Sequence, residues 1–432
     1  MRRATPAAPE AEPAVPGDGG DGDGDAAAAA LERLAPVPPP RSLLGRSADY
    51  LTVLGMFMAP LYGKRIGNSI TAPAYADLVL GLALMARGVH LLTVGIRLRT
   101  LKRHSFLLGT MGLFSLLALI SNFANRTNPL ELGYVRVVIA TLGSIILVAT
   151  YGDQESGARR QLLLAFGFGC VVLSLSSFTG LKLNGRALGW SVHPNALGHS
   201  CMMGCATAVW LWDNARKPLH RWFWAGAVFL NLAAIMNSGS RGALLGIWVA
   251  AMFFFGLRGN RKLNLLAIGG TFVAVMVLLV GIVHLPESNP LARLLSQGQQ
   301  TSSATYSDQA RSQLLKGDLA RIDAHPWFGD GFSDIVNVHV AYLQGWVAAG
   351  ALAGLVTMFV GLAMLILPLV SRRRDLALGC GAAAIATAWV FTNIFTARDQ
   401  WLFLAIAFST AQSITVLGPR RRETLASLDP RP

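Results

Sequence analysis

The sequence has few charged residues for its length. Asp, Glu, Lys and Arg make up 14% of its 432 residues, whereas hydrophobic residues make up 53%. Soluble domains carry about 25% charged residues, so this composition excludes an ordinary soluble protein. Apolar runs of about 17 to 25 residues recur along the chain, and each is long enough to cross a membrane as a helix. The sequence therefore predicts an all-α, polytopic integral membrane protein.

Cysteine is scarce as well. The sequence contains four cysteines, and all of them lie in apolar runs: Cys170, Cys201, Cys205 and Cys380. Thiols in such runs are usually small packing residues rather than disulfide partners or metal ligands. Cys201 and Cys205 fall on one helix face, but no second pair of ligands accompanies them. We therefore expect neither a metal site nor a cofactor.

Acidic residues are fewer than basic ones. The sequence contains 23 Asp and Glu against 37 Lys and Arg, which gives a formal net charge of +14. Most of the Lys and Arg residues fall in alternate loops between the apolar runs, which is typical of cytoplasmic loops rather than of a nucleic-acid-binding surface. This alternation favours cytoplasmic termini and about twelve spans, near residues 47–62, 73–96, 104–122, 132–151, 161–179, 195–213, 221–237, 241–257, 263–284, 350–370, 376–394 and 399–417.

The two ends of the chain are expected to be tails. Residues 1–40 are rich in Ala, Pro, Gly and Asp and show no apolar periodicity, which predicts a disordered cytoplasmic segment. No apolar core follows the early arginines, so we do not expect a signal peptide. The transmembrane domain is expected at residues 41–417, with a large outer loop at about 285–349 before the tenth span. Residues 418–432 are expected to form a cytoplasmic tail.

The outer loop before the sixth expected span gathers polar residues. Lys182 and Arg186 precede His193, Asn195 and His199, which stand at the start of a helix. Helix N-terminal amides favour anions, so these residues are candidates for binding an anionic substrate. The other interpretation is a capped turn, with Asn195 near the N-cap position after the helix-breaking Pro194.

A short outer turn at residues 237–243 contains a second candidate cation. Ser238 or Ser240 can cap the helix that follows, which puts Arg241 in its first turn. A cation in that position opposes the helix dipole, so it suggests an anionic partner. Interfacial snorkelling or pairing with an acid of an outer loop would also explain it.

The large outer loop has three informative parts. Apolar residues recur at helical spacing over residues 308–324, which predicts an amphipathic helix that carries Arg311 and lies along the membrane interface. Residues 326–332 then bend the chain at two glycines. His339 is expected to open a short helix that contains Tyr342 and leads into the tenth span.

Together these stretches resemble the O-antigen ligase and polymerase family of bacterial membrane glycosyltransferases. The resemblance rests on the order and placement of His193-Pro194-Asn195-x-Leu197-Gly198, of Ser238-Gly239-Ser240-Arg241-Gly242-Ala243, and of the block from Arg311 through Pro326-Trp327-Phe328-Gly329-Asp330-Gly331-Phe332 to His339-x-x-Tyr342-Leu343-Gln344 and Gly350. With the expected spans it covers most of residues 45–417. Two positions depart from the family pattern: Val340 replaces a common Asn, and Ala348 replaces a common acid.

The resemblance implies transfer of a glycan from an undecaprenyl diphosphate carrier to an acceptor hydroxyl, at the outer face of the bacterial inner membrane. It assigns Arg241 and Arg311 to the diphosphate and His339 to the acceptor. The candidate substrate-binding residues are Arg186, His193, Asn195, Ser240 and Tyr342. The partners it implies are the lipid-linked donor, a glycan or lipid acceptor, membrane lipids and other polysaccharide assembly proteins, without a nucleic acid.

Elementary chemistry supports the same roles. A departing diphosphate gains negative charge, and arginine binds phosphate oxygens two at a time while staying charged. The acceptor hydroxyl must lose a proton, and histidine is the side chain best suited to accept it near neutral pH. His339 is the better candidate in this loop, because His325 precedes Pro326 and resembles a turn residue. A structural or helix-capping role is the alternative for His339.

Polymerisation of lipid-linked repeat units and ligation of a finished glycan share this donor chemistry and differ only in the acceptor. We favour polymerisation, because nothing in the sequence identifies a lipid A core acceptor. A flippase for such lipids is the alternative of a different class. It would place charged residues at mid-membrane depth and in broken helices, whereas the candidates here are expected on one outer face.

Overall fold

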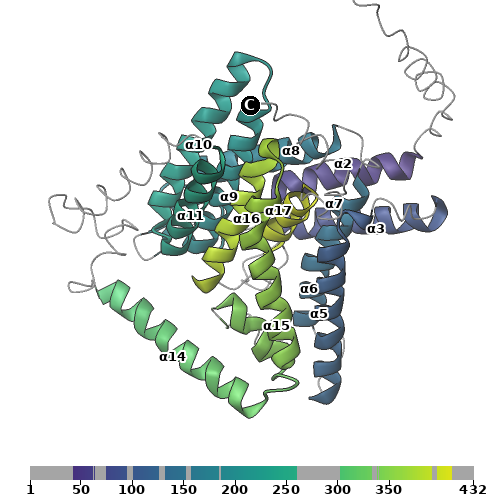
Figure 1. Cartoon of the computed structure of the whole chain (residues 1–432), viewed down its shortest axis with the longest axis vertical. Coiled ribbons are helices and arrows are strands. Elements are labelled where there is room, and N and C mark those ends of the chain that lie inside the picture. The colour runs from purple at the N-terminus through teal and green to yellow at the C-terminus, as the bar shows by residue number, and fades with distance from the viewer. Residues whose placement is uncertain are drawn as a thin grey trace, which may run out of the picture. The chain divides into compact units, whose positions relative to one another are not determined.

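The structure is a computed structural model, and it describes residues 42–61, 63, 74–94, 101–125, 132–151, 157–183, 186–259, 302–332, 338, 340–391 and 397–410. The described chain is almost entirely helical (Figure 1). The long helices up to residue 238 are α2 (Leu43–Met58), α3 (Tyr75–Val94), α5 (Ser105–Ala124), α8 (Ala158–Ser176), α9 (Pro194–Asp213) and α10 (Pro218–Ser238). Those that follow are α11 (Arg241–Leu257), α14 (Ser302–Ala324), α15 (Ala341–Val370), α16 (Leu376–Ala388) and α17 (Arg398–Phe408).

Shorter elements complete the fold. The helix over residues 132–150 consists of α6 (Leu132–Val138), a π-helical turn (Ile139–Gly143) and α7 (Ser144–Thr150). Within the described ranges, 3-10 turns lie at Ala59–Leu61, Arg373–Asp375 and Trp389–Phe391. A two-stranded antiparallel hairpin pairs β1 (Lys182–Leu183) with β2 (Arg186–Ala187). The first expected span therefore ends as a helix at Met58, and Pro60 lies in the 3-10 turn that follows.

Six helices of the described chain are long and apolar enough to cross a membrane. They are Tyr75–Val94, Ser105–Ala124, Gly133–Thr150, Ala158–Ser176, Ala341–Val370 and Arg373–Phe391. The prediction of a polytopic helical membrane protein is thus confirmed, whereas the number twelve stays a prediction. The expected span at 263–284 and the tails at 1–40 and 418–432 lie outside the described residues.

Helix α9 lies at the centre of the packing, against α8, α10, α11 and α16. Small residues allow this close approach. A Cβ atom on Gly204 would come within 2.5 Å of Asn231 Oδ1 on α10 and 2.7 Å of Cys170 Cβ on α8. All four cysteines are buried free thiols, as small packing residues should be.

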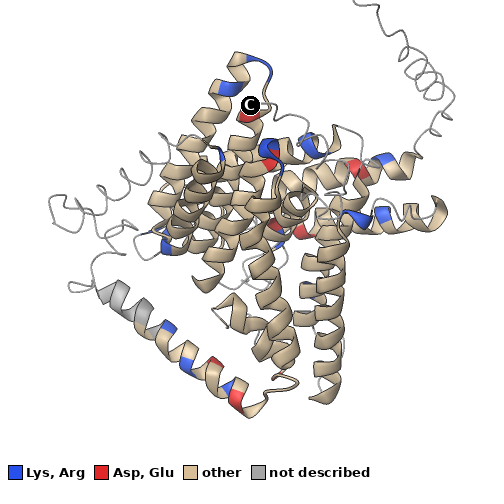
Figure 2. Cartoon of the chain, in the orientation of Figure 1, with Lys and Arg blue, Asp and Glu red and all other residues tan. Residues whose placement is uncertain are grey.

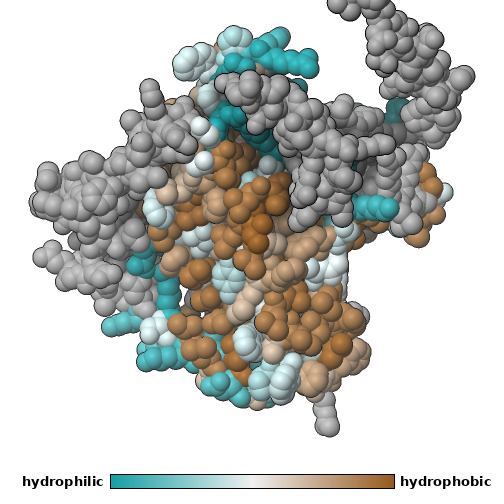
Figure 3. All heavy atoms as spheres, viewed as in Figure 1, coloured by the Kyte–Doolittle hydropathy of each residue, from teal (hydrophilic) through white to brown (hydrophobic). Residues whose placement is uncertain are grey.

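Charged and hydrophobic side chains occupy different parts of the described helices. In the described helices charged residues concentrate near helix ends and along α14 (Figure 2). Large hydrophobic residues are exposed on α3, α5 and α15, for example Leu116 and Leu362. Figure 3 shows hydrophobic side chains over α5 and α15 and hydrophilic ones along α14. The exposed hydrophobic faces are those that a lipid bilayer would cover.

Candidate active site

A small pocket is lined by arginine side chains from segments that are far apart in the sequence. It is lined by Arg186, Asn195, His199, Gly239, Ser240, Arg241, Gly242, Arg311 and Phe391. The three arginines come from β2, from the first residue of α11 and from α14. No carboxylate is among the described residues that line the pocket. A concave site with three guanidinium groups and no lining acid is suited to an anionic ligand.

Arg186 is held in place by the backbone and side chain of its neighbours. Its Nε donates a hydrogen bond to the Ser238 carbonyl oxygen at 2.7 Å, and its Nη2 donates one to Asn195 Oδ1 at 2.6 Å. Its side chain is 8% exposed. These bonds connect the hairpin, the end of α10 and the start of α9. The guanidinium is therefore fixed in orientation before any ligand arrives.

The tight turn between α10 and α11 positions the second arginine. Gly239 ends α10 with φ of +61°, a conformation that glycine adopts without steric cost. Ser240 is the N-cap of α11, and its side chain accepts a hydrogen bond from the Ala243 amide at 3.4 Å. Of the two serines proposed as caps, Ser240 takes the role. Arg241 is then the first residue of the helix, where its charge opposes the helix dipole.

Helix α9 begins beside this turn in a way that the sequence did not predict. Its N-cap is His193, whose Nδ1 accepts a hydrogen bond from the Asn195 amide at 3.1 Å. Asn195, which the capped-turn interpretation put near the N-cap position, is the second residue of the helix. The reason is Pro194, which fits the first helical position and favours an extended residue before it. The Asn195 side chain is consequently available to accept the bond from Arg186.

Gly198 lets α9 approach the turn between α10 and α11. A Cβ atom at this position would come within 2.6 Å of Ser240 Cβ, 2.9 Å of Ser238 Oγ and 3.0 Å of Ala243 Cβ. Real Cβ atoms do not approach other atoms so closely, so any larger residue must push the two helices apart. The glycine that closes the motif at 193–198 therefore belongs to the packing that builds the pocket.

Arg311 reaches the pocket from α14, more than sixty residues further along the chain. The predicted helix over residues 308–324 is confirmed as part of α14. Leu315 and Leu319 on this helix are 40% and 47% exposed, whereas Asp318 is 4% exposed. Burial raises the pKa of the Asp318 carboxyl, and the nearby Arg321 guanidinium opposes this increase. Polar and apolar residues are therefore mixed on the exposed side of α14, and the expected amphipathic pattern is not observed.

The segment after α14, residues 326–332, packs against a kink in α15. Backbone angles inside α15 leave the helical range at Ala349 and Gly350, where φ of Gly350 is +81°. This break frees two carbonyl groups, which accept hydrogen bonds from the Asp330 amide at 2.7 Å and the Gly331 amide at 3.2 Å. A Cβ atom on Gly350 would lie 1.9 Å from the Trp327 carbonyl oxygen, so only glycine fits.

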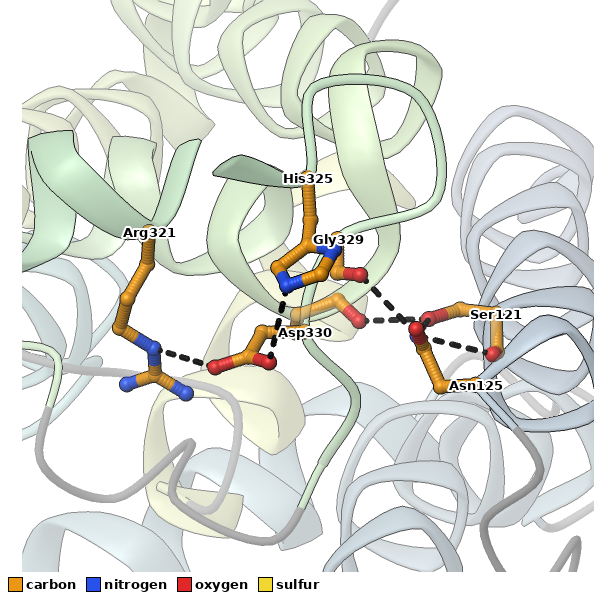
Figure 4. A network of polar contacts seen from close by, with 7 residues as sticks. Ser121, Asn125, Arg321, His325, Gly329 and Asp330 are labelled. Carbon is orange, nitrogen blue, oxygen red and sulfur yellow. Dashed lines mark hydrogen bonds and ion pairs between the residues drawn. The ribbon is translucent and has the colours of Figure 1, made fainter. Parts of the chain in front are cut away.

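Side-chain contacts also hold residues 326–332 in this position (Figure 4). Arg321 Nε donates to Asp330 Oδ2 at 2.7 Å, and His325 Nε2 lies 3.9 Å from Asp330 Oδ1. Asn125, the C-cap residue of α5, donates to the Gly329 carbonyl oxygen at 3.0 Å, while the hydroxyl of Ser121 in α5 donates to the Ala348 carbonyl oxygen at 2.9 Å. The sequence block 326–332 therefore anchors the end of α14 to α5 and α15.

The structure separates the predicted site residues into three groups. Arg186, Asn195, Ser240, Arg241 and Arg311 line one pocket. His193 is exposed at the start of α9, and Tyr342 donates its hydroxyl to the Ala386 carbonyl oxygen at 2.8 Å, so neither lines it. His339 lies outside the described residues.

His199, the second of the two histidines noted at the start of this helix, lines the pocket together with the arginines. The spacing of His199 in the sequence explains why it shares the pocket with Asn195. His199 follows Asn195 by four residues, and side chains four apart share a helix face. Its side chain is only 2% exposed.

Comparison with known protein families supports the functional interpretation of this site. Residues 226–358 match the sequence profile of a family described as O-antigen ligase. The chain carries an O-antigen ligase domain. This domain spans most of α10, all of α11 and α14, and the first part of α15, and so it includes Arg241 and Arg311. Arg186 and α9 precede the O-antigen ligase domain in the sequence but complete its pocket. No curated protein matches the chain.

Proposed function

We propose that this chain is an integral membrane glycosyltransferase of the O-antigen ligase and polymerase type, which transfers a glycan from an undecaprenyl diphosphate carrier to an acceptor hydroxyl. The observation that supports it best is the convergence of Arg186, Arg241 and Arg311 on one pocket, with Arg241 and Arg311 inside the segment that matches the O-antigen ligase family. The reaction belongs to surface polysaccharide biosynthesis on the outer face of the bacterial inner membrane.

The chemistry requires one bond to form and one to break. The acceptor oxygen attacks the anomeric carbon of the donor sugar, and the bond between that carbon and the diphosphate oxygen breaks. The lipid diphosphate leaves with the electron pair. Negative charge grows on its oxygens in the transition state, where Arg241 and Arg311 stabilise it and Arg186 provides a further fixed cation. Guanidinium forks supply this stabilisation without a metal ion.

The acceptor hydroxyl gives up its proton as the new bond forms. We propose that His339 accepts this proton as a general base. In the sequence, His339 follows the anchored segment 326–332 and precedes α15. The amides of Asp330 and Gly331 are bonded to carbonyl groups of α15, the helix that begins two residues after His339 in the sequence. A base held near the acceptor is worth about 10²- to 10⁴-fold in rate.

We favour polymerisation of repeat units over ligation of a finished glycan to lipid A core or another acceptor. Both reactions use the same donor site, so the arginine pocket supports them equally. A flippase is less well supported. Such a protein would bring charges to mid-membrane depth in broken helices, whereas the three arginines here lie at the first residue of a helix, on a hairpin and on the polar helix α14.

The decisive experiment is reconstitution of the purified protein in vesicles with lipid-linked repeat units. Longer lipid-linked chains indicate a polymerase, and label that moves to a second lipid or to a protein indicates a ligase. Movement of donor across the bilayer without bond exchange would refute the proposal and indicate a flippase. A parallel reaction with a chelator is expected to proceed at the same rate, since the arginines rather than a metal ion bind the diphosphate.

A further inference from the structure

His199 is buried in the arginine pocket with part of its imidazole unsatisfied. Its side chain is 2% exposed, and within the described chain its Nε2 atom has no hydrogen-bond partner. Buried polar atoms in folded proteins nearly always have a partner, so such an atom needs an explanation. Its neighbour Ser200 shows the usual arrangement, because its hydroxyl donates to Asp399 Oδ2 at 2.6 Å.

The unsatisfied atom faces the first turn of α11. A Cβ atom built on Gly242 would lie 3.3 Å from His199 Nε2 and 3.1 Å from Phe391 Cβ. Gly242 directly follows Arg241, so Nε2 lies beside the start of α11, and His199 lines the pocket together with Arg186 and Arg311. One helical turn earlier on α9, Asn195 accepts the bond from Arg186. The imidazole and that arginine are thus held by the same end of α9.

We propose that His199 binds the donor, with its Nε2–H group donating a hydrogen bond to a diphosphate oxygen between the guanidinium groups. This inference rests on the proposed function and names one more residue of the same donor site. The three guanidinium groups attract the anion, but each can direct hydrogen bonds to it only within the plane of that group. An N–H group rigidly fixed in the wall of the pocket adds direction to the binding. The missing partner of Nε2 is then the substrate itself.

The test measures binding of undecaprenyl diphosphate to the purified full-length protein in detergent. His199→Leu removes the donor, and His199→Gln places an amide N–H near the position of Nε2. Loss of a hydrogen bond to a charged group is expected to weaken binding about 10- to 100-fold in His199→Leu. The Gln variant is expected to stay within about threefold of the wild-type affinity.

Thr207→Val is the matched control. Thr207 lies two turns further along α9, is fully buried, and within the described chain also has an unsatisfied side-chain oxygen, but it does not line the pocket. Its replacement is expected to leave the affinity for undecaprenyl diphosphate unchanged. Should the Leu variant fail to fold, the comparison of His199→Gln with His199→Asn decides, because Asn places its amide near Nδ1 instead.

The outcomes separate this inference from the proposed function. If the wild-type protein does not bind undecaprenyl diphosphate, the proposed donor is wrong. If the wild type binds and His199→Leu binds equally well, or if Gln and Asn are equally weak, the role of His199 is refuted while the donor site stands. Weak binding by Leu and Asn with binding retained by Gln and by Thr207→Val supports the inference.

Discussion

The arginines of the pocket differ in how the protein holds them. Arg186 is nearly buried and bonded to Ser238 and Asn195, so its orientation is set by the fold. Arg241 stands at the first position of α11, where its charge opposes the helix dipole. A bound anion would relieve this conflict, because it attracts both the guanidinium and the free amides of the helix. We therefore expect Arg241 to contribute more to ligand binding than to stability.

Replacement of Arg241 or Arg311 tests this expectation. Removal of one preorganised donor costs about 10²- to 10³-fold in kcat, so Arg241→Ala and Arg311→Ala should lose that much glycan transfer in reconstituted vesicles. Lysine keeps the charge but not the planar fork, and Arg241→Lys should recover only part of the rate. Arg216→Ala, an exposed arginine outside the pocket, is the control and should transfer at the wild-type rate. Full transfer by Arg241→Ala would contradict its role.

His339→Ala should abolish transfer while protein level and binding of undecaprenyl diphosphate stay unchanged. The reason is that a base acts on the acceptor and not on the donor. Transfer and donor binding are measured on the same purified sample. His325→Ala is the control from the same loop, since His325 lies near Asp330 in the anchoring network. Equal loss in both variants would show that the loop, rather than a base, has been disturbed.

At the scale of elements, glycines decide how closely the helices that build the site can approach. Gly198 brings α9 against the turn between α10 and α11, and Gly350 lets the segment after α14 lie on the kinked α15. Both are positions where a Cβ atom would overlap its neighbours. The pocket is consequently sensitive to changes that touch none of its charged residues.

Gly198→Ala is expected to lower both the melting temperature and the transfer rate. Its new methyl group would meet Ser240 and displace the start of α11, at a cost of about 1 to 3 kcal/mol. Gly109→Ala is the matched control, because Gly109 lies inside α5 with open space around it. The control should keep its melting temperature, which differential scanning fluorimetry measures. A stable and fully active Gly198→Ala variant would show that α9 can shift without consequence.

At the scale of the whole molecule, the orientation in the membrane follows from the distribution of basic residues. The pocket is expected outside, and the loop between α9 and α10 is expected in the cytoplasm. The four native cysteines are buried, so introduced cysteines can report on accessibility. This makes the predicted orientation testable in intact cells.

Cysteines at Leu181 and Leu219 should be labelled from opposite sides. Leu181 is 51% exposed beside the β-hairpin, and Leu219 is 77% exposed at the start of α10. A membrane-impermeant maleimide should label Leu181→Cys in cells whose outer membrane is permeabilised, and Leu219→Cys only after lysis. The unmodified chain, with its buried thiols, is the control for background. The reverse pattern would place the arginine pocket in the cytoplasm and overturn the proposed location of the reaction.

The sequence by itself determined the properties that arise from composition and from neighbours along the chain. Low charge and long apolar runs predict membrane helices, because backbone groups in lipid must bond within their own helix. A serine cap for α11, at Ser238 or Ser240, and the helix over residues 308–324 depend on a few adjacent residues, and both were predictable. The motifs also sufficed to identify the family that residues 226–358 match.

Only the tertiary structure decided which of these residues meet. Whether Arg186, Arg241 and Arg311 share a pocket depends on the rotation and separation of helices, and local spacing does not encode either one. The same holds for Tyr342, whose hydroxyl is satisfied inside the bundle, and for His199, which lines the pocket with its Nε2 unsatisfied in the described chain. The physical reason is that close packing between distant segments, set by small residues such as Gly198 and Gly350, fixes the relative positions of side chains.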